Sequence, residues 1–472
     1  MRKTPRWRRV LLYTLTLLTA TASFALAQER ANNLPEITLH KGEFFFRVNG
    51  RPSFLLGHNL SVASEEELRV LLAQIAQSGE RIVRIQITSS RRPRGTREVD
   101  EAWALWWDHV FDLAAQNGLY VLPVFSQWGD WNDGGNDGTP LVWHYWKQNP
   151  FNAALGGPAD SPVELLRNTQ TRQLWLEWLR KLVTRWQGRP NILGWEIFSE
   201  IDLVSGASEA DGVDFVENAA RAIRAADTHL RPVTASLSGI NDWPSLSRSD
   251  ALDFIEIHPY ANLEPFNGNL DDLILQTVRQ RLKQYGKPIF LGESGLDARP
   301  PVNTLSVGAE APAGIKNAIW AAAVSGVMNG RMLWWEDGYD AYYHLDLRAK
   351  YQDLCLPVVS FLQNVDYTGF RPIDIALDHS TQGAALGNSR TILVWVRDAR
   401  SSAPKWPIRS LRGLTVTVSA PGPARNWKVD FYDTESGRMF KSTSAHRRAG
   451  GIAVLVPSFR GSIAFKLQAL GI

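Results

Sequence analysis

Cysteine is almost absent from the 472-residue sequence, in which Cys355 is the only one. A single thiol excludes an internal disulfide, and the mostly apolar stretch around it, residues 354–362, is typical of a helix in a protein core. HExxH, paired CxxC and glycine-rich phosphate-binding motifs are also missing. We therefore predict no metal and no cofactor. The Asp- and Gly-rich stretch 132–138 leaves a calcium ion as an alternative, although it lacks the spacing of an EF-hand loop.

Net charge is low as well, with 51 Lys and Arg against 48 Asp and Glu. Five of the basic residues lie within the first nine positions and precede an apolar run from Val10 to Leu26. Ala25-Leu26-Ala27 then supplies a small-residue cleavage pattern. We expect residues 1–27 to be a signal peptide cleaved after Ala27, which would change the formal charge from +3 to −2.

Export follows from this prediction, and a retained membrane anchor is the alternative, because the apolar run approaches the shortest length that spans a bilayer. No other segment of the sequence is long and apolar enough to cross a membrane, so we expect no stable insertion after cleavage. An exported chain without disulfides is compatible with the bacterial periplasm or exterior. The near-neutral charge gives no support for nucleic-acid binding and suits an uncharged polymer.

Residues 50–365 alternate short apolar runs with amphipathic stretches, the pattern of successive βα units. Eight units in series favour a closed (β/α)8 TIM barrel, an α/β fold, over an open sheet. The eight expected strands are Phe54–Leu56, Ile82–Ile85, Tyr120–Phe125, Ile192–Ile197, Pro232–Ser236, Phe254–Ile257, Pro288–Leu291 and Arg331–Trp334.

The pattern changes near Gly369-Phe370-Arg371-Pro372, after which short strand-like runs alternate with turns and no helical stretch appears. We predict a small C-terminal β-sandwich over residues 370–472. The catalytic barrel is expected over residues 28–369, with a β-hairpin at residues 36–50 that precedes its first strand.

Two carboxylates follow expected strands of the barrel, Glu200 after the fourth and Glu293 after the seventh. Reacting groups of such barrels lie at the C-terminal ends of the strands. Retaining glycosidases use one carboxyl group as acid/base and another, about 5–5.5 Å away, as nucleophile. Arg84 on the second strand and Tyr260 after the sixth are placed to stabilise an ionised nucleophile.

Aromatic residues are abundant, with 19 Trp in the chain, and several follow expected strands. Trp334 and Trp335 come at the end of the eighth strand and can form an apolar floor for a sugar ring. Trp128 and Trp131 lie in the long loop after the third strand, which we predict to form a wall of a substrate cleft. His58 and Asn59 end the first strand and are either sugar contacts or structural ties.

Three motifs resemble one known family. The run from Asn191 to Asp202, NILGWEIFSEID, resembles the strand-4 signature of glycoside hydrolase clan A, and is most similar to the cellulase and mannanase family, family five. Pro288–Gly295 (PIFLGESG) and His258-Pro259-Tyr260 resemble its strand-7 and strand-6 motifs. The resemblance, over residues 40–365, implies a retaining β-glycoside hydrolase. Its implied residues are Glu200 as acid/base, Glu293 as nucleophile, Arg84 and Tyr260 as nucleophile partners, and His258 as a substrate contact.

Ser199 departs from the pattern of this family, which nearly always has Asn immediately before the acid/base, where it binds the sugar 2-hydroxyl. The shorter serine leaves the substrate class open, and we expect β-mannan or β-1,4-glucan as the glycan. It also keeps an alternative function open, a carbohydrate-binding protein with weakened turnover. A transglycosylase that uses the same residues is a second alternative.

Overall fold

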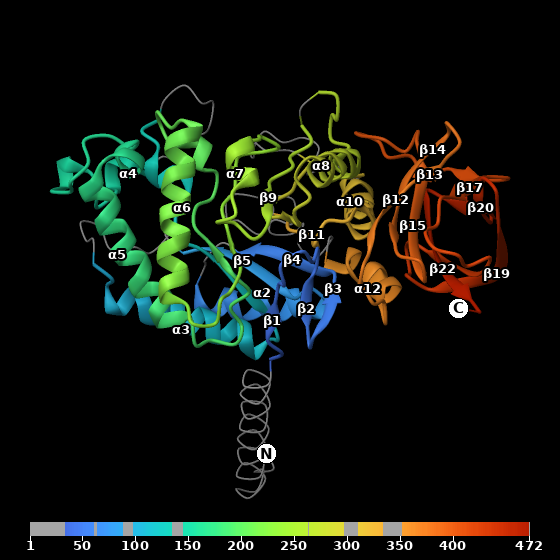
Figure 1. Cartoon of the computed structure of the whole chain (residues 1–472), viewed down its shortest axis with the longest axis horizontal. Coiled ribbons are helices and arrows are strands. Elements are labelled where there is room, and N and C mark those ends of the chain that lie inside the picture. Colours follow the sequence, from blue (N-terminus) through green and yellow to red (C-terminus); the bar gives the residue numbers. More distant parts are fainter. Residues whose placement is uncertain are drawn as a thin grey trace, which may run out of the picture.

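The computed structural model describes residues 34–60, 64–87, 98–134, 145–262, 264–296, 310–333 and 352–471. Figure 1 shows a helix-rich part with parallel strands, coloured blue to light orange, beside a darker orange-to-red part built of strands. Among the described residues, no helix combines the length and the hydropathy that crossing a bilayer requires.

Eight parallel strands form the first part. They are β4 (Leu55–Leu60), β5 (Ile82–Gln86), β6 (Tyr120–Val124), β7 (Trp195–Glu196), β8 (Val233–Thr234), β9 (Ile255–Ile257), β10 (Ile289–Leu291) and β11 (Asn329–Arg331). Ladders join β11-β4-β5-β6-β7-β8 and β9-β10, and the bridges Ser236–Glu256 and Ser294–Leu333 connect the two sets. The strands therefore close on themselves, which confirms the predicted TIM barrel. The eighth strand begins two residues earlier than predicted.

Helices cover the outside of the barrel (Figure 1). They are α2 (Glu65–Gln77), α3 (Glu101–Gln116), α4 (Glu164–Arg167), α5 (Thr169–Trp186), α6 (Glu209–Ala226), α7 (Pro244–Arg248), α8 (Leu270–Tyr285), α10 (Ala311–Ser325) and α12 (Leu356–Leu362). Ser64 and Glu67 form a capping box at the start of α2, and the Asp100 side chain caps α3. Such caps satisfy N–H groups that the first helical turn leaves unpaired.

The predicted N-terminal hairpin is present and has a third strand, so that β1 (Ile37–Thr38), β2 (Phe46–Val48) and β3 (Arg51–Ser53) form one sheet. Phe46 is fully buried and packs edge-on against Phe254 and Phe290, which lie at the starts of β9 and β10. The hairpin thus closes the end of the barrel at which the strands begin, opposite the predicted site.

The C-terminal part is an antiparallel β-rich domain, as predicted. Its strands are β12 (Arg371–Ile373), β13 (Ile375–Ala376), β14 (Thr381–Gly387), β15 (Thr391–Asp398), β16 (Ser410–Leu411), β17 (Thr415–Val418), β18 (Asn426–Asp433), β19 (Met439–Arg448), β20 (Gly451–Leu455), β21 (Phe459–Arg460) and β22 (Ser462–Leu470). The long strand β19 pairs with β18 in the order β12-β14-β15-β22-β18-β19, and with β20 in the order β19-β20-β17-β13. It therefore belongs to two layers, and their facing side chains form the core of this domain.

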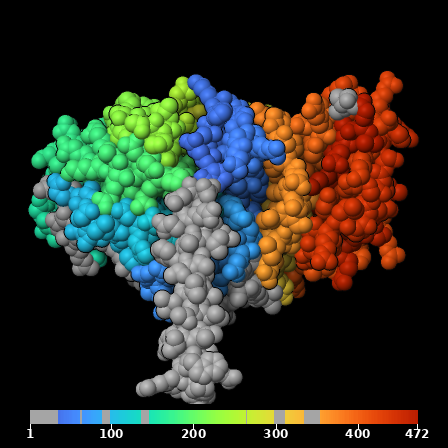
Figure 2. All heavy atoms as spheres, turned by 90° about the horizontal axis from the view of Figure 1, so that it is seen from below, coloured from blue at the N-terminus to red at the C-terminus, as the bar shows by residue number. Residues whose placement is uncertain are grey.

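The strand β15 shows how the C-terminal domain joins the barrel. Ile392, Val394 and Val396 point into the core of the domain, whereas Leu393 and Trp395 belong to the core that includes α10. This alternation follows from the two-residue period of a strand. One sheet of the domain is therefore buried on both faces, and Figure 2 shows the orange and red part packed directly against the rest.

Candidate active site

Glu200 and Glu293 occupy the ends of opposite barrel strands. Glu293 follows β10 by two residues, and Glu200 follows β7 at the start of the short 3-10 helix η5 (Ile201–Leu203). Glu200 adopts a left-handed backbone conformation with φ 59°, which costs a non-glycine residue about 1–3 kcal/mol. Its backbone N–H donates to Ser236 Oγ at 3.0 Å, and this bond helps to hold the strained turn that directs the side chain into the mouth.

Arg84 on β5 is the centre of the site and is fully buried. Nη1 donates to Glu293 Oε1 at 2.8 Å and to Asn59 Oδ1 at 3.0 Å. Nη2 donates to Ser199 Oγ at 2.7 Å and to Glu196 Oε1 at 2.7 Å, and Nε donates to Glu196 Oε2 at 2.6 Å. A guanidinium has five N–H donors, so every donor of Arg84 has an acceptor and its position is fixed.

Glu293 is held in its ionised form. Arg84 donates to one oxygen, and the Tyr260 hydroxyl donates to the other, Oε2, at 2.8 Å. Burial by itself would raise the pKa of Glu293, but the charges of His258 and Arg84 and the hydrogen bonds from Tyr260 and Arg84 lower this pKa below its usual value. Arg84 and Tyr260 thus lie where the sequence predicts them, around a carboxylate.

The surroundings of Glu200 shift its pKa in the opposite direction. Its Oε1 lies 2.7 Å from His258 Nδ1, and the side chain is 12% exposed. Burial raises the pKa of Glu200, the hydrogen bond from His258 lowers it, and the charge of Glu293 raises it again, so that this pKa stays above its usual value. A carboxyl oxygen of Glu200, a ring nitrogen of His258 and a carboxyl oxygen of Glu293 all lie within 4.8 Å of one another.

These three side chains also have the composition of a metal site. Two features oppose a cation there. Burial lowers the pKa of His258, but Glu293, Glu200 and Glu256 raise it to about 10, so its nitrogens carry protons at neutral pH. The Arg84 guanidinium, in contact with Glu293, adds a second positive charge. Metal ligands have to be deprotonated, so this arrangement favours a proton network over an ion.

Of the two interpretations of His58 and Asn59, sugar contacts or structural ties, the hydrogen bonds favour structural ties. Successive residues of β4 face opposite sides, and His58 points away from the barrel axis, where Nδ1 lies 3.3 Å from Glu80 and contacts Arg331. Asn59 points inward but is fully buried, because its amide donates to the carbonyls of Gly292 and Met332. Both residues are structural ties.

His258, Ser199 and Trp131 also differ from the expectation of direct contact with substrate. His258 is fully buried behind Glu200, and Ser199 is 1% exposed with its hydroxyl oxygen bound to Arg84. Trp131 is 1% exposed. Its indole N–H donates to Ser126 Oγ, and its ring packs against Trp146 in the protein interior. Their burial leaves them no surface on which a sugar could lie.

Trp128 remains a candidate for the wall of the cleft. It begins the 3-10 helix η1 (Trp128–Trp131), is half-buried, and its backbone N–H donates to Ser199 O at 3.0 Å, which places it beside the strand that carries Glu200. Trp334 and Trp335 lie outside the described residues, so their prediction as a floor for the sugar stays a prediction.

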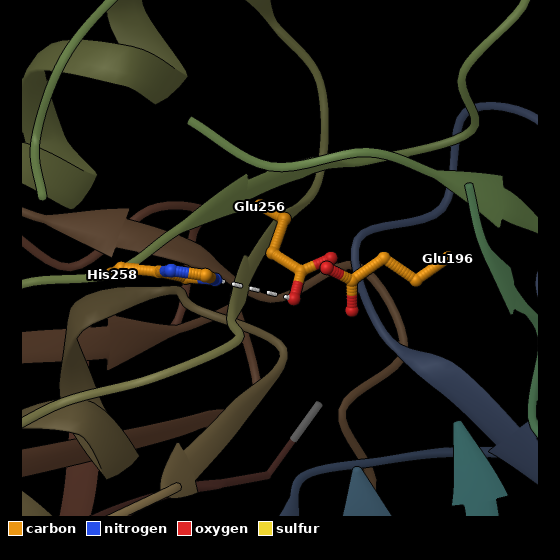
Figure 3. A group of neighbouring side chains, drawn as sticks. All are labelled: Glu196, Glu256 and His258. Carbon is orange, nitrogen blue, oxygen red and sulfur yellow. Dashed lines mark ion pairs between the residues drawn. The ribbon is translucent and has the colours of Figure 1, made fainter. Parts of the chain in front are cut away.

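Glu256 is the main residue that the sequence prediction missed. It lies on β9 between two isoleucines, 4% exposed, and Figure 3 shows its carboxyl group facing Glu196 and the His258 ring. The signal was present in the sequence, since an acidic residue within an apolar strand needs a buried partner. Its position two residues before His258 also puts both side chains on one face of the strand. Glu196 is fully buried in the barrel interior and bound to Arg84.

Residues 47–321 match the model of a protein family described as Cellulase (glycosyl hydrolase family 5). The chain belongs to this family. The match covers more than half of the sequence and includes every strand of the barrel except β11, so the protein is a glycoside hydrolase by family. No curated protein matches the sequence.

Solved structures support the fold of this family 5 protein over nearly its whole length. A structure described as a glycoside hydrolase has 14% identity and a TM-score of 0.62, covering 93% of this chain and 98% of the other. A glycoside hydrolase family 5 structure from Bacteroides vulgatus ATCC 8482 has 13% identity and a TM-score of 0.60, covering 92% and 94%. A putative glycoside hydrolase from the same organism has 11% identity and a TM-score of 0.61, covering 93% and 83%. At these identities the likeness concerns the fold alone.

Proposed function

We propose that the protein is a retaining β-glycoside hydrolase in which Glu200 is the acid/base and Glu293 the nucleophile. The main supporting observation is the different setting of two neighbouring carboxyl groups. Arg84 and Tyr260 donate hydrogen bonds to Glu293, and its pKa is lowered, whereas Glu200 is buried beside His258 and Glu293, and its pKa is raised. An acid that keeps its proton and a carboxylate that stays ionised are what this reaction needs. One carboxyl oxygen of each residue lies within 4.8 Å of the other, which is compatible with the short separation of retaining enzymes.

The reaction follows from these positions. Glu200 gives its proton to the glycosidic oxygen as a Glu293 oxygen attacks the anomeric carbon, so the bond to the leaving sugar breaks and a glycosyl ester forms. Glu200, now ionised, then takes a proton from water, whose oxygen attacks the same carbon and releases Glu293. Arg84 and the Tyr260 hydroxyl stabilise the negative charge of Glu293 before the attack and after its release.

The substrate we propose is a β-linked polysaccharide or oligosaccharide of the β-mannan or β-1,4-glucan class. Family membership supports a glycan, and the half-buried ring of Trp128 beside the site offers a stacking surface for one sugar. A carbohydrate-binding protein with weak turnover is the second candidate. The observation that favours it is Ser199, whose hydroxyl oxygen is engaged by Arg84 and buried.

Release of reducing ends from a panel of β-glucans, β-mannans and β-galactans tests the proposal, with Glu200→Gln and Glu293→Gln as variants. We expect activity in the parent and a loss of about a thousandfold in both variants, within the range that acid–base groups contribute. Glu80→Gln is the matched control, because Glu80 is also buried but lies with His58 outside the site. Binding of one glycan by an inert parent would replace hydrolysis by the binding function.

We also propose that residues 1–27 direct export to the periplasm or the exterior and are then removed. The basic residues at the N-terminus, the apolar run from Val10 to Leu26 and the Ala25-Leu26-Ala27 pattern support this. N-terminal sequencing of the exported protein should give Gln28 as its first residue. A membrane-bound chain that begins at Met1 would instead establish the anchor.

A further inference from the structure

A second pair of carboxylates lies beneath Glu200 and Glu293. Glu196 and Glu256 approach each other beside His258 (Figure 3), and all three are buried. Glu256 Oε1 lies 3.2 Å from Arg84 Nε and 3.7 Å from His258 Nε2. Neither oxygen of Glu256 accepts a hydrogen bond from the part of the chain that the structure describes. Its close partners are therefore two cationic side chains, and every donor of Arg84 already has another acceptor.

Gly292 makes the approach of Glu256 to His258 possible. A Cβ atom at this position would lie 2.0 Å from Glu256 Oε1 and 2.6 Å from His258 Nε2, closer than any real contact allows. The residue directly before Glu293 thus has no side chain where the carboxylate and the imidazole meet. Glu256 and His258 can therefore approach each other in this way only because residue 292 is a glycine.

Charged groups surround His258 from four strands. Glu200 follows β7 and lies 2.7 Å from Nδ1, while Glu293 follows β10 and lies 3.8 Å from the same nitrogen. Glu256 on β9 faces Nε2, and the positive charge of Arg84 on β5 also acts on the ring. An imidazole with carboxylates at both nitrogens offers an N–H to each of them only when it is protonated twice.

We propose that Glu256 is a positioning residue that keeps a proton on Nε2 of His258. The Nδ1–H of His258 is then always directed at Oε1 of Glu200, so the transferable proton of Glu200 lies on Oε2, the oxygen free to face the leaving group. Without Glu256, a neutral His258 can present a lone pair at Nδ1 and draw the proton of Glu200 toward itself. This role rests on the proposed function of Glu200.

The direct test is a pH titration of the His258 ring by NMR in histidine-labelled full-length protein, assigned with a His258→Asn variant. The carboxylates around His258 hold its pKa at about 10. In Glu256→Gln we expect this pKa to fall by about one unit or more, a tenfold loss of proton affinity. Glu256→Asp keeps the charge but moves it away from Nε2, and should give an intermediate value. Glu80→Gln should leave the titration unchanged.

Kinetics on the best glycan substrate then test the effect on Glu200. For Glu256→Gln, the ratio of variant to parent kcat should fall with pH, from about one third near pH 6 to about one tenth or less near pH 9, with KM little changed. A ratio that is constant with pH would show a merely structural role and overturn the proposal. So would a His258 titration in either Glu256 variant that matches the parent.

The two proposals fail in different ways. If the parent hydrolyses none of the glycans, the proposed function is lost, while the NMR titration still decides whether Glu256 controls the protonation of His258. If the parent is active and Glu256→Gln follows the same pH profile, only the role of Glu256 is lost.

Discussion

Arg84 and Arg397 are both among the largest fully buried side chains of the molecule, and both are held by acidic residues. Arg84 connects strands inside the barrel and contacts Glu196, Glu256 and Glu293. Arg397, on β15, connects the two domains. Its Nε contacts Asp271 and its Nη2 lies 3.0 Å from Asp272, both in the first turn of α8.

In both clusters one arginine faces more than one carboxyl group, and in each cluster the pKa of one of these carboxyl groups is raised. Burial, together with the charge of Glu256, raises the pKa of Glu196 to about 8 although Arg84 opposes this shift. Burial and the charge of Asp271 likewise raise the pKa of Asp272 to about 6 against the effect of Arg397. The two clusters differ in position, because Glu293 on Arg84 lies with Glu200 at the end of the barrel where the strands terminate, whereas Arg397 joins β15 to the start of α8. The same type of contact thus belongs to the proposed active site in one place and to the contact between the domains in the other.

The largest effect is expected from Arg84→Met, which removes the cation from three carboxylates at once. Activity should fall by about 10²–10³-fold or more, because Glu293 loses an electrostatic partner. Stability should fall by about 3–5 kcal/mol, because buried charges are left without a partner. Activity assays and urea unfolding measure the two effects.

Arg84→Lys is the matched variant, since it keeps the charge but cannot reproduce the five-donor geometry. It should recover part of the stability and little of the activity. Full activity in Arg84→Lys would mean that charge alone, without the fixed position of Glu293, is sufficient.

The architecture of the barrel could be predicted from the sequence because alternation of apolar runs and amphipathic stretches is a local signal. The proximity of Glu200 and Glu293 could be predicted because strand ends of a barrel converge at one mouth. An acidic residue in an apolar strand indicated a buried partner for Glu256, but the identity of that partner could not be predicted, since Arg84 and His258 come together only when β5 and β9 face each other across the closed barrel.

The orientation of individual side chains was the second property that could not be predicted from the sequence. His58 and Asn59 are neighbours in sequence, but the pleat of β4 sends one outward and the other inward, and a strand boundary uncertain by one residue exchanges them. Trp128 and Trp131 belong to one 3-10 helix, and composition alone does not tell which ring enters the core. Such choices depend on packing between segments that are distant in the sequence.

Arg397→Met should affect stability with little effect on catalysis, in contrast to Arg84→Met. Removing Arg397 leaves Asp271, which is 1% exposed, without its cation, and we expect a loss of about 3–5 kcal/mol in the free energy of unfolding. Residual activity at 25 °C should stay within about threefold of the parent, because no contact of Arg397 reaches Glu200 or Glu293. Urea unfolding with parallel assays measures this, and a loss of activity as large as that of Arg84→Met would show that docking of the C-terminal domain shapes the site.

Asp272→Asn should give the smallest effect, visible in the pH dependence of stability. The pKa of Asp272 is about 6 in the folded protein, above its ordinary value of 3.8, so folding favours the protonated form. Its contribution to stability is therefore fully present below the unfolded pKa and is lost as the pH rises through 6. Relative to the parent, Asp272→Asn should gain about 1–3 kcal/mol between about pH 4 and pH 7, as the displaced pKa implies. Urea unfolding at several pH values measures this difference, with Lys316→Met, at the contact of α10 with Glu435, as an interface control that should show no such slope. A difference independent of pH would mean that Arg397 neutralises both aspartates, so that only the cluster around Arg84 has a surplus carboxylate.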